Sequence, residues 1–437
     1  MTGAVAAREH RRAVVAAHAA LEALETALAL DRGDHIASAT ASLDKALAKP
    51  VLTDVDRAAV AARRTQLGHA LASTLDQRAA LAAYAREHGI GGVRAWTTSS
   101  GVRIYRISTE SFPRHVNYVY AIDFGDELVL WDCGSGLHRA RQMILDGFAL
   151  VERAFGHRIA PADIDVILVS HGHYDHFGDA GWWKAAAQAP LWIHELDARV
   201  VENFAERTVL TGRDMAVWLA AAGCVDEEVR RLVAMYLESK EVYASVAVDR
   251  RLRHGQSFFH GRARAIHTPG HCPGHICLRI DEAILVADQV LAPVTPHLSP
   301  QALHPNNGLS RYLAGLGRLV LEDDVRLVLP AHYDDIPDLR SRIGEIADDH
   351  VDKLKKTMAI CKSGATIVDV AGELFGAQEG YTVLLAILEA GTHVEYLHQL
   401  GALAVTDLDR VVAGLPHRYR ATEHVHADAF GVELGGG

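Results

Sequence analysis

One short segment constrains this chain more than any other. The run Val166-Ile-Leu-Val169 is continuous, apolar and β-branched, as is typical of a strand buried on both faces of a sheet. Four residues of metal-ligating type follow it within six positions: His171, His173, Asp175 and His176. Three imidazoles and one carboxylate form a ligand set suited to zinc, iron or manganese. The chain must therefore build a covered sheet whose strand ends deliver ligands to one place.

Three later segments offer further ligands. Ile284-Leu-Val-Ala-Asp288 and Val325 to His332 each have the pattern of an apolar strand that ends in a residue of ligand type. A carboxylate in such a buried place needs a charged partner, and a metal ion is the natural one for Asp288. Between the two ligand-bearing strands around residues 170 and 288, Pro269-Gly270 predicts a tight turn that presents His271. His267 and His275 flank that turn and are also ligands by residue type.

Composition narrows the class of protein. The chain has 437 residues, enough for two or three domains, and its formal charge of −11 argues against a protein built mainly to hold nucleic acid or anionic lipid. Five cysteines, an odd number with no Cys-x-x-Cys spacing, favour a reducing cytoplasm over a secreted disulfide framework. No apolar run reaches the roughly 18 residues that a membrane span needs, and the alanine-rich N-terminus lacks a signal-peptide core. We expect a cytoplasmic protein with no membrane partner.

Periodicity divides the chain into four regions. Residues 1–92 show helical spacing and no cluster that suggests chemistry; residues 93–336 alternate strands and helices and form the expected α/β catalytic domain. The pattern of residues 337–423 indicates a small helical domain, in which Thr366 is a predicted N-cap, and that of 424–437 a flexible tail. The helical regions are candidates for homo-oligomer contacts.

The combined motifs resemble those of the metallo-β-lactamase superfamily. Its signature is His-x-His-x-Asp-His followed by distant His, Asp and His, and the match covers about residues 93–332. The resemblance implies an αββα sandwich. The segments after residue 295 resemble a glyoxalase II-like branch that carries a C-terminal winged-helix domain.

The resemblance also implies a role for each ligand. His171, His173 and His271 would hold a first metal ion; Asp175, His176 and His332 would hold a second. Asp288 would bridge the two ions, and Asp132 would brace the metal-binding loops without touching a metal. The sequence departs from the family pattern at Gly178-Asp179 and at Ala331-His332-Tyr333. These departures leave the ligands intact but alter the walls of the expected substrate pocket.

Two further residues are candidates for a catalytic role beside Asp175 and Asp288. Tyr174 has a hydroxyl that would donate to a substrate oxygen, although packing beside the site is the plainer interpretation. His304 lies in a predicted loop and would serve as a general acid or a substrate contact. No separate organic cofactor is expected.

The resulting hypothesis is a binuclear hydrolase in which a metal-bridging hydroxide attacks a thioester, ester or lactone carbonyl of a small-molecule or carrier-bound acyl substrate. Two divalent ions are expected, with zinc the first choice and iron or manganese the alternatives. An iron-dependent oxidoreductase on the same fold stays open, although His173 stands where the flavodiiron pattern has glutamate. An RNA-cleaving enzyme fits the winged-helix resemblance but not the charge. A non-enzymatic binding protein fits a complete ligand set poorly, and a true β-lactamase usually lacks the bridging aspartate.

Overall fold

The fold was obtained as a computed structural model, which describes residues 41–45, 47, 48, 50, 92–112 and 115–423. The expected helical region 1–92 and the tail 424–437 therefore lie almost entirely outside the described residues; within them, 41–45 are helical. The chain divides into two compact units, one of residues 1–96 with Asp146–Ile159 and one of Thr97–Leu145 with Ala160–Gly437. Strand β1 (Val93–Thr97), except for its last residue, and the part of helix α4 (His138–Phe155) from Asp146 on fall in the first unit. Every element discussed below belongs to the second.

The first sheet follows the order of the chain. Its neighbouring strands in the larger unit are β2 (Arg103–Phe112), β3 (His115–Asp123), β4 (Leu128–Trp131), β5 (Val166–Leu168), β6 (Leu191–His194) and β7 (Arg250–Leu252). Pairing is antiparallel from β2 to β4 and parallel from β4 to β7. All three residues of β5 are buried, as the apolar run before His171 predicts for a strand in the middle of a sheet.

The second sheet is mixed, and its neighbouring strands also follow the order of the chain. In sheet order its strands are β12 (Leu327–Pro330), β11 (Ala283–Ala287), β10 (Ile276–Ile280), β9 (Ala263–His267) and β8 (Ser257–Phe258). Strand β12 pairs parallel to β11, and the others pair antiparallel. Parallel pairing brings the carboxyl ends of β11 and β12 to the same edge, which places Asp288 near His332.

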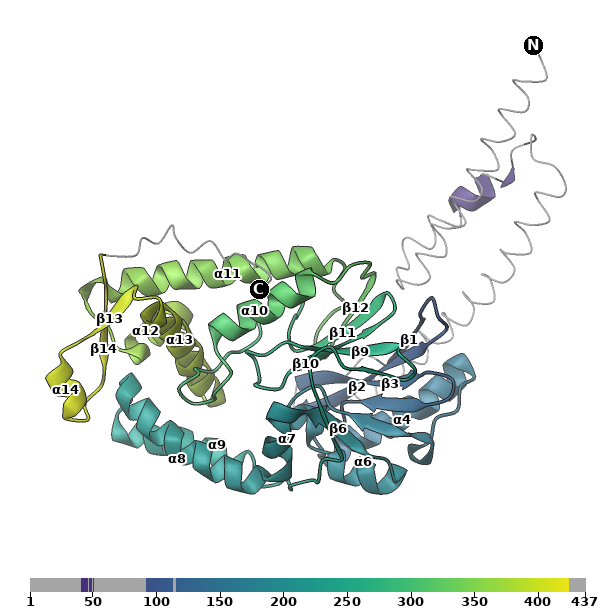
Figure 1. Ribbon diagram of the computed structural model, residues 1–437, viewed down its shortest axis with the longest axis horizontal. Coiled ribbons are helices and arrows are strands. Elements are labelled where there is room, and N and C mark those ends of the chain that lie inside the picture. The colour runs from purple at the N-terminus through teal and green to yellow at the C-terminus, as the bar shows by residue number, and fades with distance from the viewer. Residues whose placement is uncertain (1–40, 46, 49, 51–91, 113–114, 424–437) are drawn as a thin grey trace, which may run out of the picture. The chain divides into compact units, whose positions relative to one another are not determined.

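Helices cover the outer faces of both sheets (Figure 1). On the first sheet lies α6 (Ala180–Ala187), with the 3₁₀ turn Pro161–Asp163 before β5, and the single turn of α5 (Tyr174–Phe177) precedes α6 in the chain. On the second lie α10 (Leu309–Val320) and α11 (Leu339–Ile360). The two-sheet α/β sandwich expected from the sequence is confirmed.

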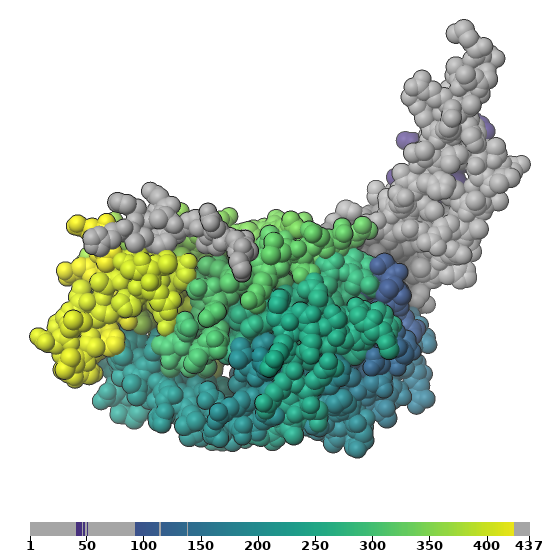
Figure 2. Space-filling model, viewed as in Figure 1, coloured from purple at the N-terminus to yellow at the C-terminus, as the bar shows by residue number. Residues whose placement is uncertain are grey.

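The helices between β6 and β7 were not expected. The sequence predicts continued alternation of strands and helices there, but the chain instead forms three helices in a row: α7 (Glu195–Glu202), α8 (Phe204–Ala222) and α9 (Asp226–Glu238). Helices α8 and α9 pack against each other, and Figure 2 shows them in teal beside the green and yellow C-terminal elements, with a small opening between the two. This insertion brings side chains to the candidate site that the motif search did not find.

The C-terminal elements share a core with the second sheet. After α11 and the turn Cys361–Ser363 come α12 (Ile367–Phe375), α13 (Tyr381–Gln399), β13 (Leu403–Thr406), α14 (Leu408–Val412) and β14 (Arg418–Ala421). Val286 of β11, Leu316 of α10, Ile343 of α11 and Val394 of α13 all belong to one buried apolar cluster. The predicted N-cap is confirmed, because Thr366 forms a capping box with Asp369. The domain boundaries at residues 93 and 337 stay predictions.

None of the helices in the described part of the chain combines the length and apolarity that crossing a bilayer requires.

Candidate metal centre

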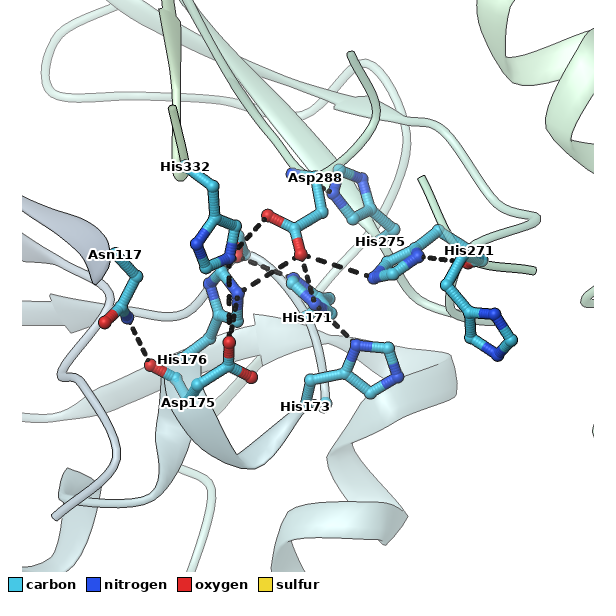
Figure 3. A network of polar contacts seen from close by, with 12 residues as sticks. Asn117, His171, His173, Asp175, His176, His271, His275, Asp288 and His332 are labelled. Atoms are coloured by element: carbon cyan, nitrogen blue, oxygen red, sulfur yellow. Dashed lines mark hydrogen bonds and ion pairs between the residues drawn. The ribbon is translucent and has the colours of Figure 1, made fainter. Parts of the chain in front are cut away.

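Strand ends from both sheets deliver the predicted ligands to one place (Figure 3). The loop after β5 carries His171 and His173, and the single turn of α5 carries Asp175 and His176. Asp288 directly follows β11 and His332 follows β12, while His271 lies in the turn between β9 and β10. The seven ligands predicted from sequence therefore meet at the edge between the two sheets.

Asp288 stands at the middle of the group. Its Oδ2 lies 3.9 Å from His171 Nε2, 3.4 Å from His271 Nε2 and 3.4 Å from His176 Nε2. Its Oδ1 lies 3.3 Å from His332 Nε2. One carboxylate thus faces both the histidines expected at the first metal ion and those expected at the second (Figure 3).

The remaining ligand atoms complete two groups. His173 presents Nδ1, 3.1 Å from His171 Nε2. Asp175 Oδ2 lies 3.6 Å from His176 Nε2 and 3.6 Å from His332 Nε2. His115, at the start of β3, adds an imidazole that the sequence did not predict, with its Nε2 3.3 Å from Asp175 Oδ2.

These spacings suit divalent metal ions. Nitrogen and oxygen ligands at about 2.0–2.1 Å from a tetrahedral zinc ion lie about 3.3 Å from one another, and the observed separations bracket that value. Three buried atoms in the group, His176 Nε2, His271 Nε2 and Asp288 Oδ1, have no hydrogen-bond partner in the protein. Buried polar atoms normally have a partner, so three unpartnered ligand atoms aimed at one point indicate that metal ions belong there. The residues present fit the cofactor that the sequence implies.

The outer ring nitrogens fix the direction of each imidazole. His176 Nδ1 donates to Asp132 Oδ2 at 2.9 Å, His271 Nδ1 to the carbonyl oxygen of His297 at 2.7 Å, and His332 Nδ1 to the carbonyl oxygen of Val116 at 2.9 Å. Since these acceptors cannot donate, each Nδ1 carries a proton, and Nε2 is the ring nitrogen directed at the centre. Such outer contacts set tautomer and orientation before any ion binds.

The pKa shifts reflect a crowded, buried centre. Burial lowers the pKa values of His171 and His173 well below the ordinary value, which keeps both rings neutral, as metal ligation requires. Burial raises the pKa of Asp288, but His332 and His176 outweigh it and hold that pKa well below the ordinary range. The same balance, with His176 as the main neighbour, lowers the pKa of Asp175. Both carboxylates are therefore charged at neutral pH.

Asp132 braces the loops, as the resemblance implies. Its side chain is fully buried, and its two oxygens accept hydrogen bonds from the backbone N–H of Ser170 at 2.7 Å and from the Ser170 hydroxyl at 2.9 Å. The same Ser170 oxygen lies 2.9 Å from His171 Nδ1. Asp132 thereby positions a ligand from each predicted metal group without facing the centre itself.

Asp197 is a second brace, which sequence reasoning missed. This fully buried residue of α7 accepts the backbone N–H of Gly172 at Oδ2 and that of Gly274 at Oδ1, both at 2.7 Å. Burial raises its pKa to about 6 despite these two donors. It joins the loop of His171 and His173 to the turn of His271, and only its position in the fold reveals that role.

In the described part of the chain, neither of the two other catalytic candidates forms a hydrogen bond or ion pair with a predicted ligand. Tyr174 packs edge-on against Phe112, with ring centroids 5.2 Å apart, and next to Tyr243 at 5.0 Å. His304 Nδ1 is buried without a partner, and burial with the charges of Arg207 and Lys240 lowers its pKa to about 4. A catalytic role for either residue stays a prediction.

His267 and His275 already have partners in the protein. His267 Nε2 donates to the carbonyl oxygen of Pro273 at 2.8 Å. His275 contacts Thr268 Oγ1 through Nδ1 at 2.8 Å and accepts the backbone N–H of Asp288 at Nε2 at 3.2 Å. His275 therefore positions the central carboxylate from its backbone side.

Comparison with known proteins places this arrangement in a family. A family model described as the metallo-beta-lactamase superfamily matches residues 113–332. The lactamase-like protein ptaB of Pestalotiopsis fici is 30% identical over 125 residues, which are 26% of this chain and 37% of ptaB. An uncharacterised protein of Mycobacterium leprae is 24% identical over 218 residues, 49% of this chain and 84% of that protein. The chain thus aligns with little more than a third of ptaB, and with most of the mycobacterial protein.

Solved structures share the fold. A metallo-beta-lactamase family protein of Thermus thermophilus is 24% identical, with 73% of this chain and 98% of that chain covered at a TM-score of 0.58. A beta-lactamase domain protein of Burkholderia ambifaria is 22% identical, with 76% and 93% covered at a TM-score of 0.52. With a family match over half of its length and this two-sheet fold, the chain belongs to the metallo-beta-lactamase superfamily, whose members are mostly metal-dependent hydrolases.

Proposed function

We propose that this protein is a binuclear metal-dependent hydrolase that cleaves a thioester, ester or lactone carbonyl. The observation that carries the proposal is the position of Asp288. Its Oδ2 faces His171 and His271, and its Oδ1 faces His332, all within 4 Å. A single carboxylate between two histidine groups is the arrangement that two adjacent ions need.

In this proposal the side chains of the protein hold the metal ions and orient the ligands around them. Bound divalent ions would supply an acidified water molecule and polarise the substrate carbonyl oxygen. Asp175 and Asp288 offset two of the four positive charges, and the imidazoles stay neutral at His171 and His173 because of burial. Asp132, Ser170 and Asp197 keep the ligand loops rigid, so the geometry exists before substrate arrives.

We propose further that zinc is the metal and that the substrate is a small-molecule or carrier-bound acyl compound. The ligand set of imidazole and carboxylate suits zinc, with iron and manganese as alternatives. We also propose that the protein belongs to the glyoxalase II-like branch and that its C-terminal region is winged-helix-like. The helices α12 and α13, followed by the antiparallel strands β13 and β14, support the second of these. All five cysteines are buried free thiols, which supports a cytoplasmic location.

Metal analysis and a substrate panel test the proposal together. Untagged protein is analysed by plasma mass spectrometry and then assayed against thioesters, esters and lactones. We expect about two zinc ions per chain, loss of hydrolysis after chelation and recovery on adding zinc. Iron as the main metal, with oxygen consumption and no hydrolysis, would establish the oxidoreductase alternative. Salt-sensitive cleavage of RNA instead of acyl compounds would establish the nuclease alternative.

A further inference from the structure

The insertion between β6 and β7 brings an unpaired cation close to the metal centre. Lys240, just after α9, lies with its Nζ 4.0 Å from the ring centroid of Tyr236 and 4.7 Å from that of Tyr174. Within the described part of the chain no carboxylate forms an ion pair with it. Burial lowers the pKa of Lys240 to about 8, and Asp175, a predicted metal ligand, is the acidic group whose charge acts against that shift. A half-buried ammonium needs an anionic partner, and aromatic rings replace only part of its lost hydration.

A second cation stands on the same side. Arg207 of α8 is half-buried and has no ion-pair partner among the residues that the structure describes. The charges of Arg207 and Lys240 both act on His304, whose pKa they help to lower. Arg207 and Lys240 are therefore both within electrostatic reach of one imidazole, in a protein whose net charge is −11.

Tyrosine rings pack around Lys240 and next to the predicted metal ligand Asp175. Tyr174 adjoins Asp175 in sequence, and its ring lies 5.0 Å from that of Tyr243. Lys240 Nζ contacts the rings of both Tyr174 and Tyr236, which brings α9 next to the residue that precedes Asp175. Tyrosine rings present apolar faces and a hydroxyl at one edge, and both features suit contact with the carbon chain of an organic substrate.

We propose that Lys240, with Arg207, binds a carboxylate or phosphate group of the substrate while the substrate carbonyl lies at the metal centre. The inference rests on the proposed hydrolase function and narrows it to acyl compounds that carry an anionic group. A bound anion would supply the negative charge with which Lys240 and Arg207 form no ion pair in the described part of the protein. Lys240 is in this view a specificity-determining residue, and the ligands of the metal centre perform the chemistry.

Two matched pairs of thioesters test the proposal with metal-loaded, full-length protein. Succinyl- and butyryl-N-acetylcysteamine differ by a carboxylate, and acetyl-4′-phosphopantetheine and acetyl-pantetheine differ by a phosphate. We expect kcat/KM to favour the anionic member of at least one pair by about tenfold, mainly through KM, the size of one charge-assisted hydrogen bond. The pair that shows the preference identifies the anion. Equal rates within both pairs would overturn the proposal.

Variants assign that preference to Lys240. Lys240→Met should bring the ratio within the favoured pair close to one, and Lys240→Arg should restore most of it. Lys355→Met, at an exposed lysine of α11, is the matched control and should leave ratio and rate unchanged. A fall of equal size for both members of the pair in Lys240→Met would contradict the assignment.

A binding measurement separates this inference from the proposed function. Calorimetry compares non-hydrolysable thioether analogues of the same two pairs. If no thioester is hydrolysed, the proposed function fails, but tighter binding of the anionic thioether that Lys240→Met abolishes would still support the anion site. Equal binding of charged and neutral thioethers to the wild-type protein would overturn it.

Discussion

At the scale of single residues, Asp288 is the carboxylate that faces the histidines of both predicted metal groups. Asp288→Ala should therefore lose at least one metal ion per chain and lower kcat/KM by more than about 100-fold, since ligands of both ions lose their common partner. Plasma mass spectrometry after dialysis measures the metal content. Asp348→Ala, at an exposed carboxylate of α11, is the control. Two retained ions in Asp288→Ala would exclude the bridging assignment.

The charge on Lys240 gives the substrate preference a pH dependence. Because its pKa is lowered to about 8, the ammonium loses its proton as pH rises through that value, whereas an ordinary lysine would stay charged to above about pH 10. The charged and titratable groups around it are Asp175, Tyr174, Tyr236 and His304. The kcat/KM ratio of anionic to neutral thioester should fall several-fold between about pH 7 and pH 9, with a midpoint near 8. A ratio that stays constant over this range would show that Lys240 does not bind the anion.

Some residues near the candidate metal centre could be identified from the sequence, and others could not. The convergence of the seven predicted ligands could be anticipated because several of these residue types follow apolar strands, and strand ends of neighbouring sheets meet. His115 and Lys240 carry no such mark. His115 contacts Asp175, and Lys240 lies against Tyr174, only through the tertiary arrangement of β3 and of the α7–α9 insertion. A lone histidine or lysine in a sequence gives no sign of what will face it.

At the scale of elements, Asp197 joins two loops that carry ligands. Asp197→Ala would leave the buried N–H groups of Gly172 and Gly274 without an acceptor, at about 1–3 kcal/mol each. We expect a lower melting temperature together with weaker metal retention, measured by calorimetry and by metal analysis during dialysis. Asp214→Ala, at a half-exposed carboxylate of α8 that pairs only with its neighbour Arg213, is the control. Unchanged metal retention would show that the loops hold their positions without this brace.

Element by element, prediction succeeded where the pattern was simple. The buried β5, the strands β11 and β12 before Asp288 and His332, and the Thr366 cap were all anticipated. The three successive helices α7 to α9 were not, because alternation of strand and helix was extended across a region where the chain inserts helices between two parallel neighbours. Periodicity identifies a helix, but it does not say how many helices precede the next strand.

At the scale of the whole molecule, the metal centre draws on one compact unit. Its residues lie between His115 and His332, and none belongs to the smaller unit of residues 1–96 and Asp146–Ile159. Removing residues 1–88 should therefore leave the metal content per chain unchanged and kcat/KM within about twofold, while the melting temperature falls because part of the smaller unit is lost. Metal analysis and thioester hydrolysis of untagged protein beginning at Gly89 measure the first two, and calorimetry measures the third. Loss of metal on truncation would mean that the N-terminal residues support the centre, which would make them part of the catalytic unit and not an appendage to it.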